Sequence, residues 1–163
     1  MKTRRNISCF VVCDNKNGNL ERCLVLLEWI RKFDLRKAGI CSVAAGGINI
    51  IVHSLVIANM LSYLWVNGGR SESLAAARQI SMSSILLTIL NILIALIASQ
   101  IIPIKLNRFW GSTLSVFLIV TLPLSLLGVI QQFLGTTFEM CVMGPVTIIG
   151  FCADFRIAFE KRW

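Results

Sequence analysis

The chain has 163 residues, of which 56% are apolar and 15% are charged, and its formal net charge is +8. About a quarter of the residues of an ordinary soluble domain are charged, so the composition excludes a typical soluble domain and favours an integral membrane protein. The positive charge is concentrated beside an apolar segment and has no recognisable nucleic-acid-binding fold around it, so nucleic acid is not an expected partner.

Residues 1–37 form the first predicted unit, a cytoplasmic arm. In "NLERCLVLLEWIRKFDLRK" the apolar residues recur at helical spacing, which predicts an amphipathic juxtamembrane helix over about 20–37. Its side chains Arg31, Lys32, Arg36 and Lys37 are expected to face anionic lipid headgroups. The simpler interpretation is a short basic helix that recognises no particular lipid.

The arm also contains three of the six cysteines, Cys9, Cys13 and Cys23. Thiols stay reduced in the cytoplasm, so free thiols are the first expectation for these positions. S-acylation is the functional alternative, because it occurs on cysteines close to a membrane surface.

Residues 38–163 form the second predicted unit, an all-α bundle of four transmembrane helices. Asp, Glu, Lys and Arg are absent from three stretches that each exceed the roughly 20 apolar residues needed to cross a bilayer. These stretches predict spans near 39–64, 82–104 and 110–134. A fourth span near 138–158 has a shorter uncharged core, and it reaches spanning length only if Asp154 and Arg156 lie at the headgroups.

The distribution of Lys and Arg favours four spans over three. Basic residues collect on the cytoplasmic side of membrane proteins. With four spans and both termini inside, fourteen of the sixteen basic residues are cytoplasmic, whereas three spans leave eleven there. The prediction is a multi-pass protein with both termini in the cytoplasm.

Each predicted span has a stripe of small and polar residues, which allows helices to approach closely and to hydrogen-bond in lipid. The stripes predict a compact bundle. Counting from the predicted span ends places His53 and Asn91 at one depth, so we expect these two side chains to meet. Asp154 is expected to be compensated by Arg36 or Lys37 together with lipid headgroups. The residues expected to make interhelical polar contacts are Asn49, His53, Asn91, Gln132 and Asp154.

No catalytic or metal-binding pattern is present in the sequence. There is one histidine, and the nucleophile-elbow, phosphate-loop and zinc-protease motifs are absent. We therefore expect a protein that is not an enzyme and that needs no cofactor or metal.

The stretch "WIRKFDLRKAGICSVAAGGINIIVHSLV" leads from a short charged segment directly into a first helix rich in small residues. It resembles the start of small four-span proteins related to the lysosomal-associated transmembrane family, including insect members. The end of the chain, "FCADFRIAFEKRW", is similar in layout. The chain departs from that family in having no paired cysteines before the first helix and no Pro-Pro-x-Tyr motif in the tail. The resemblance implies an endosomal or lysosomal adaptor without enzymatic activity.

Three functional hypotheses follow. The first is a non-enzymatic organiser of the membrane or trafficking adaptor, with the lipid bilayer and other membrane proteins as partners. The second is a small channel or transporter component whose pathway passes His53. The third is a divergent or truncated piece of a larger receptor. The expected location is an endosomal, lysosomal or plasma membrane, and the oligomeric state is left open.

Overall fold

The computed structural model describes residue 30 and residues 32–160, and all regular secondary structure in this part of the chain is helical. Its elements are α2 (Leu35–Ile57), η1 (Tyr63–Trp65), η2 (Asn67–Gly69), α3 (Leu74–Ala98), α4 (Arg108–Phe133), the π-helical turn η3 (Glu139–Met143) and α5 (Gly144–Ala158). The four segments Leu35–Ile57, Leu74–Ala98, Arg108–Phe133 and Glu139–Ala158 are long and apolar enough to cross a membrane. Most of the predicted helix over about 20–37 lies outside the described residues. The same holds for all of Arg31, Cys9, Cys13 and Cys23.

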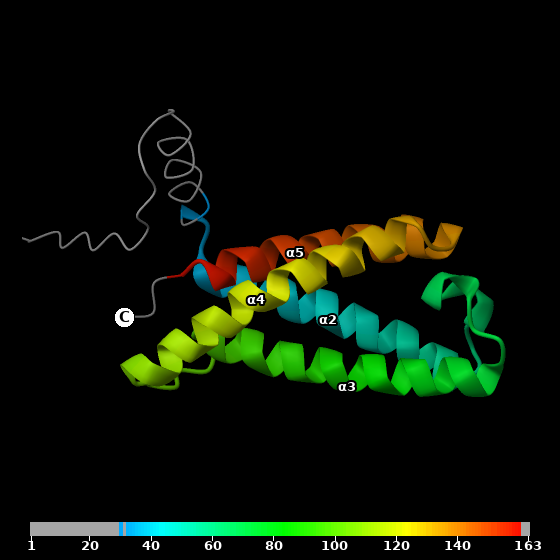
Figure 1. Ribbon diagram of the computed structural model, residues 1–163, viewed down its shortest axis with the longest axis horizontal. Helices are drawn as coiled ribbons and strands as arrows, with labels where there is room; N and C mark the ends of the chain where they lie inside the picture. The colour runs from blue at the N-terminus through cyan, green and yellow to red at the C-terminus, as the bar shows by residue number, and fades with distance from the viewer. Residues whose placement is uncertain (1–29, 31, 161–163) are drawn as a thin grey trace, which may run out of the picture.

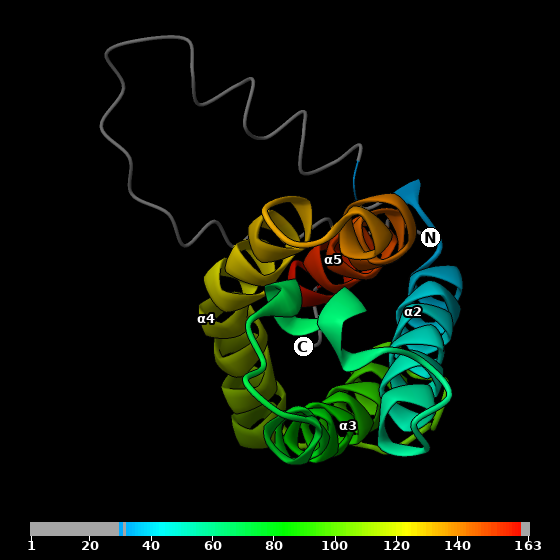
Figure 2. The same cartoon turned by 90° about the vertical axis from the view of Figure 1, so that its right-hand side faces the viewer.

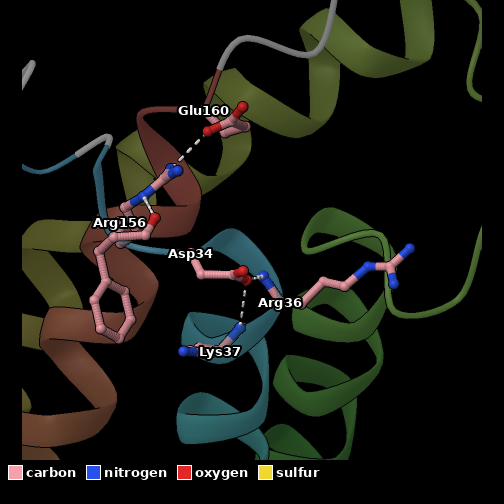
Figure 3. Close-up of polar contacts among 6 residues, drawn as sticks. Asp34, Arg36, Lys37, Arg156 and Glu160 are labelled. Atoms are coloured by element: carbon pink, nitrogen blue, oxygen red, sulfur yellow. Dashed lines mark hydrogen bonds and ion pairs between the residues drawn. The ribbon is translucent and has the colours of Figure 1, made fainter.

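Polar side chains determine where the helices begin. Asp34 accepts hydrogen bonds from the backbone N–H groups of Arg36 and Lys37, at 2.8 and 3.1 Å (Figure 3). Ser73 caps α3 and Asn107 caps α4 in the same manner, each through the N–H group three residues later. Such caps satisfy N–H groups that a helix cannot pair internally.

The helix ends differ from the ends of the apolar stretches. α2 ends at Ile57 because the chain turns at Asn59, whose φ is 57°, and α3 ends at Ala98, shortly before Gln100 with φ 58°. α3 begins at Leu74, eight residues before the predicted span, and its first turns include Arg78. The apolar stretches of the sequence alone do not define the helix ends, because the capping residues Asp34 and Ser73 lie before those stretches begin.

The helices form a ring in which α3, α2, α5 and α4 follow one another (Figure 2). α2 packs against α3 and α5, and α5 packs against α4, whereas α3 and α4 hardly touch. α4 begins near α3 and ends near α5 (Figures 1 and 2). We call the end where α2 begins and α5 ends the terminal end, and the opposite end, with residues 58–73 and 134–138, the loop end.

Close helix contacts depend on glycine. A Cβ atom added at Gly46 would lie 2.8 Å from a side-chain carbon of Ile92 and 3.3 Å from Thr88. A Cβ atom at Gly39 would overlap Ser99, which is fully buried. The backbones of α2 and α3 therefore approach as closely as the small residues allow, which is the expected mode of helix association in lipid.

Within the described residues, most of the buried apolar side chains belong to two clusters. One contains Ala38, Ala95, Ala98, Leu118, Leu122, Ile157 and Ala158 towards the terminal end. The other contains Val52, Val56, Val66, Ala77 and Met143 at the loop end. Many large apolar side chains on the outer faces of the helices are exposed, as expected for surfaces that meet acyl chains.

The predicted compact packing is wrong for the interior of the bundle. The polar stripes of α2 and α3 meet each other, but those of α3 and α4 do not, because these two helices stay apart along most of their lengths. A polar cavity occupies the space between them.

Candidate functional site

The candidate site is a cavity of about 610 Å³ lined by all four long helices and by the loop that joins α2 to α3. Its polar and charged lining residues are Ser42, Asn49, His53, Asn67, Arg70, Ser84, Thr88, Asn91, Ser125, Gln131, Gln132, Glu139, Thr147 and Asp154. This volume lies within the usual range for small-molecule sites, roughly 300–1,000 Å³.

At the terminal end of the cavity, a carboxylate is held by hydroxyl and amide groups. Ser42 of α2 donates its hydroxyl to Asp154 of α5 at 2.7 Å, and the side chain of Asn91 of α3 lies beside the same carboxylate. Asp154 makes no ion pair with the described residues. Three helices thus meet at an acidic side chain that has no basic partner among the described residues.

The predicted compensation of Asp154 by Arg36 or Lys37 is wrong. Both basic side chains are exposed in the first turn of α2, where their backbone N–H groups bind Asp34. The basic residue close to Asp154 in sequence, Arg156, instead contacts Glu160 at 2.6 Å and the carbonyl oxygen of Phe33 at 2.8 Å (Figure 3). Asp154 lies on the cavity side of α5.

The middle of the cavity is uncharged and polar. The amide nitrogen of Asn49 donates to the hydroxyl of Thr88 at 2.8 Å, and this hydroxyl donates to the carbonyl oxygen of Ser84. On the opposite wall, Gly128 of α4 has open space where a Cβ atom would stand. The missing side chain therefore widens the cavity at this level.

The loop end of the cavity contains a histidine and a second carboxylate. Nδ1 of His53 lies 3.1 Å from the hydroxyl of Ser81, in a contact between α2 and α3. Nearby on α4, the side-chain oxygen of Gln132 is buried and has no hydrogen-bond partner among the described residues, and the same holds for the amide nitrogen of Asn67 in the loop. Buried polar atoms are normally paired, so these two atoms are suited to bind water or a solute in the cavity.

Glu139 closes the loop end by binding backbone rather than a basic side chain. Its carboxylate accepts the N–H of Gly68 at 2.9 and 3.0 Å and the N–H of Thr136 at 2.9 Å. The hydroxyl of Thr136 in turn accepts the N–H of Glu139 at 3.3 Å and donates to the carbonyl oxygen of Trp65 at 2.5 Å. Thr136 and Glu139 form a capping box, and through it the loop between α2 and α3 is attached to the start of η3.

All five residues expected to make interhelical polar contacts, namely Asn49, His53, Asn91, Gln132 and Asp154, line the cavity. The predicted partnership of His53 with Asn91 is wrong, because His53 pairs with Ser81, whereas Asn91 lies beside Asp154. The error follows from the helix ends: α3 begins earlier than its apolar stretch, so Asn91 lies deeper in the bundle than the span-based count places it.

Glu139 is a charged cavity residue that the sequence did not identify. The pattern Thr136-Thr137-Phe138-Glu139 has the spacing of a capping box and could have indicated its local role. Its bonds to Gly68 connect positions 71 residues apart. No local pattern indicates such a pairing.

The basic residues expected at the headgroups lie at the terminal end. Lys32, Arg36 and Lys37 are exposed there. Their position is compatible with a membrane surface, and the contact with lipid stays a prediction.

Within the described residues, no group of three or more His, Cys, Asp or Glu side chains could hold a metal ion. Comparisons of the chain with protein-family models, with curated proteins and with solved structures find no match. The resemblance to the lysosomal-associated transmembrane family therefore stays a prediction. The four long apolar helices indicate a multi-pass integral membrane protein.

Proposed function

We propose that the protein is a non-enzymatic channel or transporter component that takes a small cation into its central cavity. The observation that carries this proposal is the pair of acidic groups at the two ends of one polar cavity, Glu139 at the loop end and Asp154 at the terminal end. At 1.5 Å per residue, the fifteen positions between them correspond to about 22 Å along the helix. The polar cavity thus extends through most of the hydrocarbon core of a bilayer, which is about 30 Å thick.

The chemistry of the lining favours a cation over an anion. Carboxylate, amide and hydroxyl oxygens are suitable ligands for hard cations and can replace part of an ion's hydration shell. The charged residues that line the cavity are Asp154, Glu139 and Arg70, and Arg70 lies on the exposed loop rather than between the helices. A cation that enters from the loop end meets Gln132 there and Asn49 and Thr88 in the middle before it reaches Asp154.

The free-energy cost of placing acidic groups inside membrane spans also supports a transport function. Ionisable groups inside membrane spans are expensive, and they usually mark ion or substrate pathways. A protein that only organised partners through its outer faces could join its helices with uncharged polar pairs such as Asn49 and Thr88, without an acidic group. The organiser and trafficking-adaptor hypothesis remains the alternative, and no contact within the described residues favours it specifically.

The orientation belongs to the same proposal. With both termini in the cytoplasm, fourteen of sixteen basic residues are on that side. Asp154 then lies towards the cytoplasm, while His53 and Glu139 lie towards the lumen or the cell exterior. An endosomal, lysosomal or plasma membrane is the proposed location.

A flux measurement in proteoliposomes tests the proposal. Purified full-length protein is reconstituted, and potential-driven uptake of ⁸⁶Rb⁺ is compared with that of protein-free liposomes. We expect uptake above the protein-free level, lost in Asp154→Asn and in Gly128→Phe, which fills the open middle of the cavity. Gly47→Phe is the matched control, because Gly47 also has open space beside it but does not line the cavity.

Two results would overturn the proposal. One is wild-type uptake no higher than that of protein-free liposomes. The other is full uptake by Gly128→Phe when it reconstitutes to the same density as Gly47→Phe. Monodisperse elution of each variant in detergent excludes misfolding as the cause of a loss.

A further inference from the structure

The bundle has a second, smaller cavity between α3 and α4, the two helices that hardly touch. Its volume is about 160 Å³, and its apolar wall includes Leu90, Ile94, Phe117, Leu118 and Leu122. It shares Asn91, Ser125 and Asp154 with the central cavity. A side opening of the bundle therefore leads to the same carboxylate.

The walls of this opening change from apolar to polar with depth. Leu90 and Phe117 are 52% and 46% exposed on the outer surface, where a bilayer would meet them. Leu118 and Leu122 are buried further in, and Asp154 with Asn91 lies where the two cavities join. A molecule that fits this sequence of surfaces has an apolar chain and a polar head.

The sign of the head follows from the hydrogen bonds of Asp154. A carboxylate offers about four acceptor positions. Within the described residues the Asp154 carboxylate accepts the hydroxyl of Ser42, has the uncharged amide of Asn91 beside it, and makes no ion pair. An ammonium group supplies further donors together with the missing positive charge, whereas a phosphate or carboxylate head would be repelled.

We infer that the gap between α3 and α4 is a lateral portal through which an amphiphilic amine with one alkyl chain enters from the bilayer. Its ammonium group binds Asp154, and its chain lies between Leu90, Phe117 and Leu118. This inference rests on the proposed function, because it names the class of cation that the cavity takes up. It differs from aqueous ion permeation in the route of access, which is the lipid phase.

Equilibrium binding of radiolabelled dodecylamine to the full-length protein in nanodiscs tests the portal. We expect saturable binding that unlabelled dodecylamine displaces and that dodecanol, with the same chain and no charge, does not. Asp154→Asn should weaken binding by about thirtyfold or more, as for the loss of one partner of a buried charge pair. This variant nearly preserves side-chain volume, so the bundle keeps its packing.

Two neighbouring positions on α4 provide a matched pair. Thr121 lines the portal, whereas Val120 is exposed and lines neither cavity. Thr121→Phe should therefore reduce dodecylamine binding, and Val120→Phe should leave it unchanged. Equal effects of the two substitutions would overturn the inference.

The remaining outcomes separate the portal from the proposed function. Displacement by dodecanol as strong as by dodecylamine would mean that the gap holds an ordinary acyl chain, and the portal inference would fail. Rb⁺ uptake without saturable dodecylamine binding would overturn the portal alone. Saturable binding that depends on Asp154, without Rb⁺ uptake, would support the portal and overturn the aqueous cation pathway.

Discussion

His53 of α2 and Ser81 of α3 face each other at the loop end of the bundle, with Nδ1 of the imidazole 3.1 Å from the hydroxyl oxygen. Both side chains are buried, so the contact joins the two helices where little water competes for it. A double-mutant cycle of His53→Ala and Ser81→Ala should give a coupling of about 0.6 kcal/mol, and at most about 1.7 kcal/mol, in the free energy of unfolding. Unfolding in mixed micelles measures it. Additive effects of the two substitutions would show that the pair does not stabilise the α2–α3 contact.

Gly46 and Gly47 are neighbours with opposite surroundings. A Cβ atom at Gly46 would lie 2.8 Å from Ile92, whereas one at Gly47 would meet nothing within 4 Å. Gly46→Ala should destabilise the protein by about 1–3 kcal/mol through overpacking. Gly47→Ala should stabilise it by roughly 0.5–1 kcal/mol, because alanine loses less backbone entropy in a helix. Thermal unfolding in detergent compares the two, and equal shifts would contradict the close approach of α2 and α3.

Glu139 should control the order of the loop between α2 and α3. Glu139→Ala removes the acceptor of the N–H groups of Gly68 and Thr136. Leaving such groups unpaired costs about 1–3 kcal/mol each when they stay buried, so both amides should exchange with solvent faster. Hydrogen exchange measured by mass spectrometry on peptides covering residues 62–73 and 134–140 gives the readout.

Two further variants act as controls for Glu139. Glu139→Gln keeps one carbonyl oxygen and should have a smaller effect on exchange. Glu72→Gln changes an exposed carboxylate of the same loop and should have none. Unchanged exchange in Glu139→Ala would mean that Glu139 does not hold the loop.

Asp34, which precedes the first membrane-spanning segment, should make the start of α2 sensitive to acid. The hydrogen bond from the backbone N–H of Lys37, together with the N–H of Arg36 and the two positive charges, holds the pKa of Asp34 below its ordinary value. Because the pKa is lower in the folded state, the cap stabilises α2 above the ordinary pKa, about 3.9, and this stabilisation is lost as the pH falls through the folded value.

Substitution by asparagine isolates this effect. Asp34→Asn keeps a good N-cap that does not titrate. The melting temperature of the wild-type protein should therefore fall relative to that of Asp34→Asn as the pH drops from about 5 to about 3. Asp34→Ala should melt at a lower temperature than either at neutral pH. Parallel pH profiles for wild type and Asp34→Asn would contradict the cap.

The number of long helices could be predicted because the uncharged stretches are much longer than a bilayer requires. Their ends could not, since Ser73 and Asp34 start helices before the apolar runs begin. Because of this shift, the prediction paired His53 with Asn91. The partner of His53 in the structure is Ser81. Depth in a bundle is thus only as accurate as the helix ends from which it is counted.

The cavity was harder to anticipate than the residues that line it. The polar stripe of each helix identified Asn49, Gln132 and Asp154 as inward-facing. Whether such stripes close on one another or surround a space depends on how far α3 and α4 diverge. That divergence depends on the packing of α3 on α2, the packing of α4 on α5, and the contact of Glu139 with the loop. All three join residues that are far apart in the sequence.

Cysteine accessibility in the membrane directly tests whether a hydrated polar cavity lies within the four-helix bundle. The native cysteines are replaced, and single cysteines are introduced at Ser84 and Gly128, which line the cavity, and at Leu86 and Leu127, which are exposed on the outer surface and line neither cavity. Thiols react with methanethiosulfonates as thiolates, which form only in contact with water. A trimethylammonium methanethiosulfonate should modify the cysteines at positions 84 and 128 and spare those at 86 and 127, with a cysteine at Glu72 as the positive control. If the cysteines at both cavity positions were unreactive in a protein whose position-72 control reacts, the bundle would not contain a hydrated cavity.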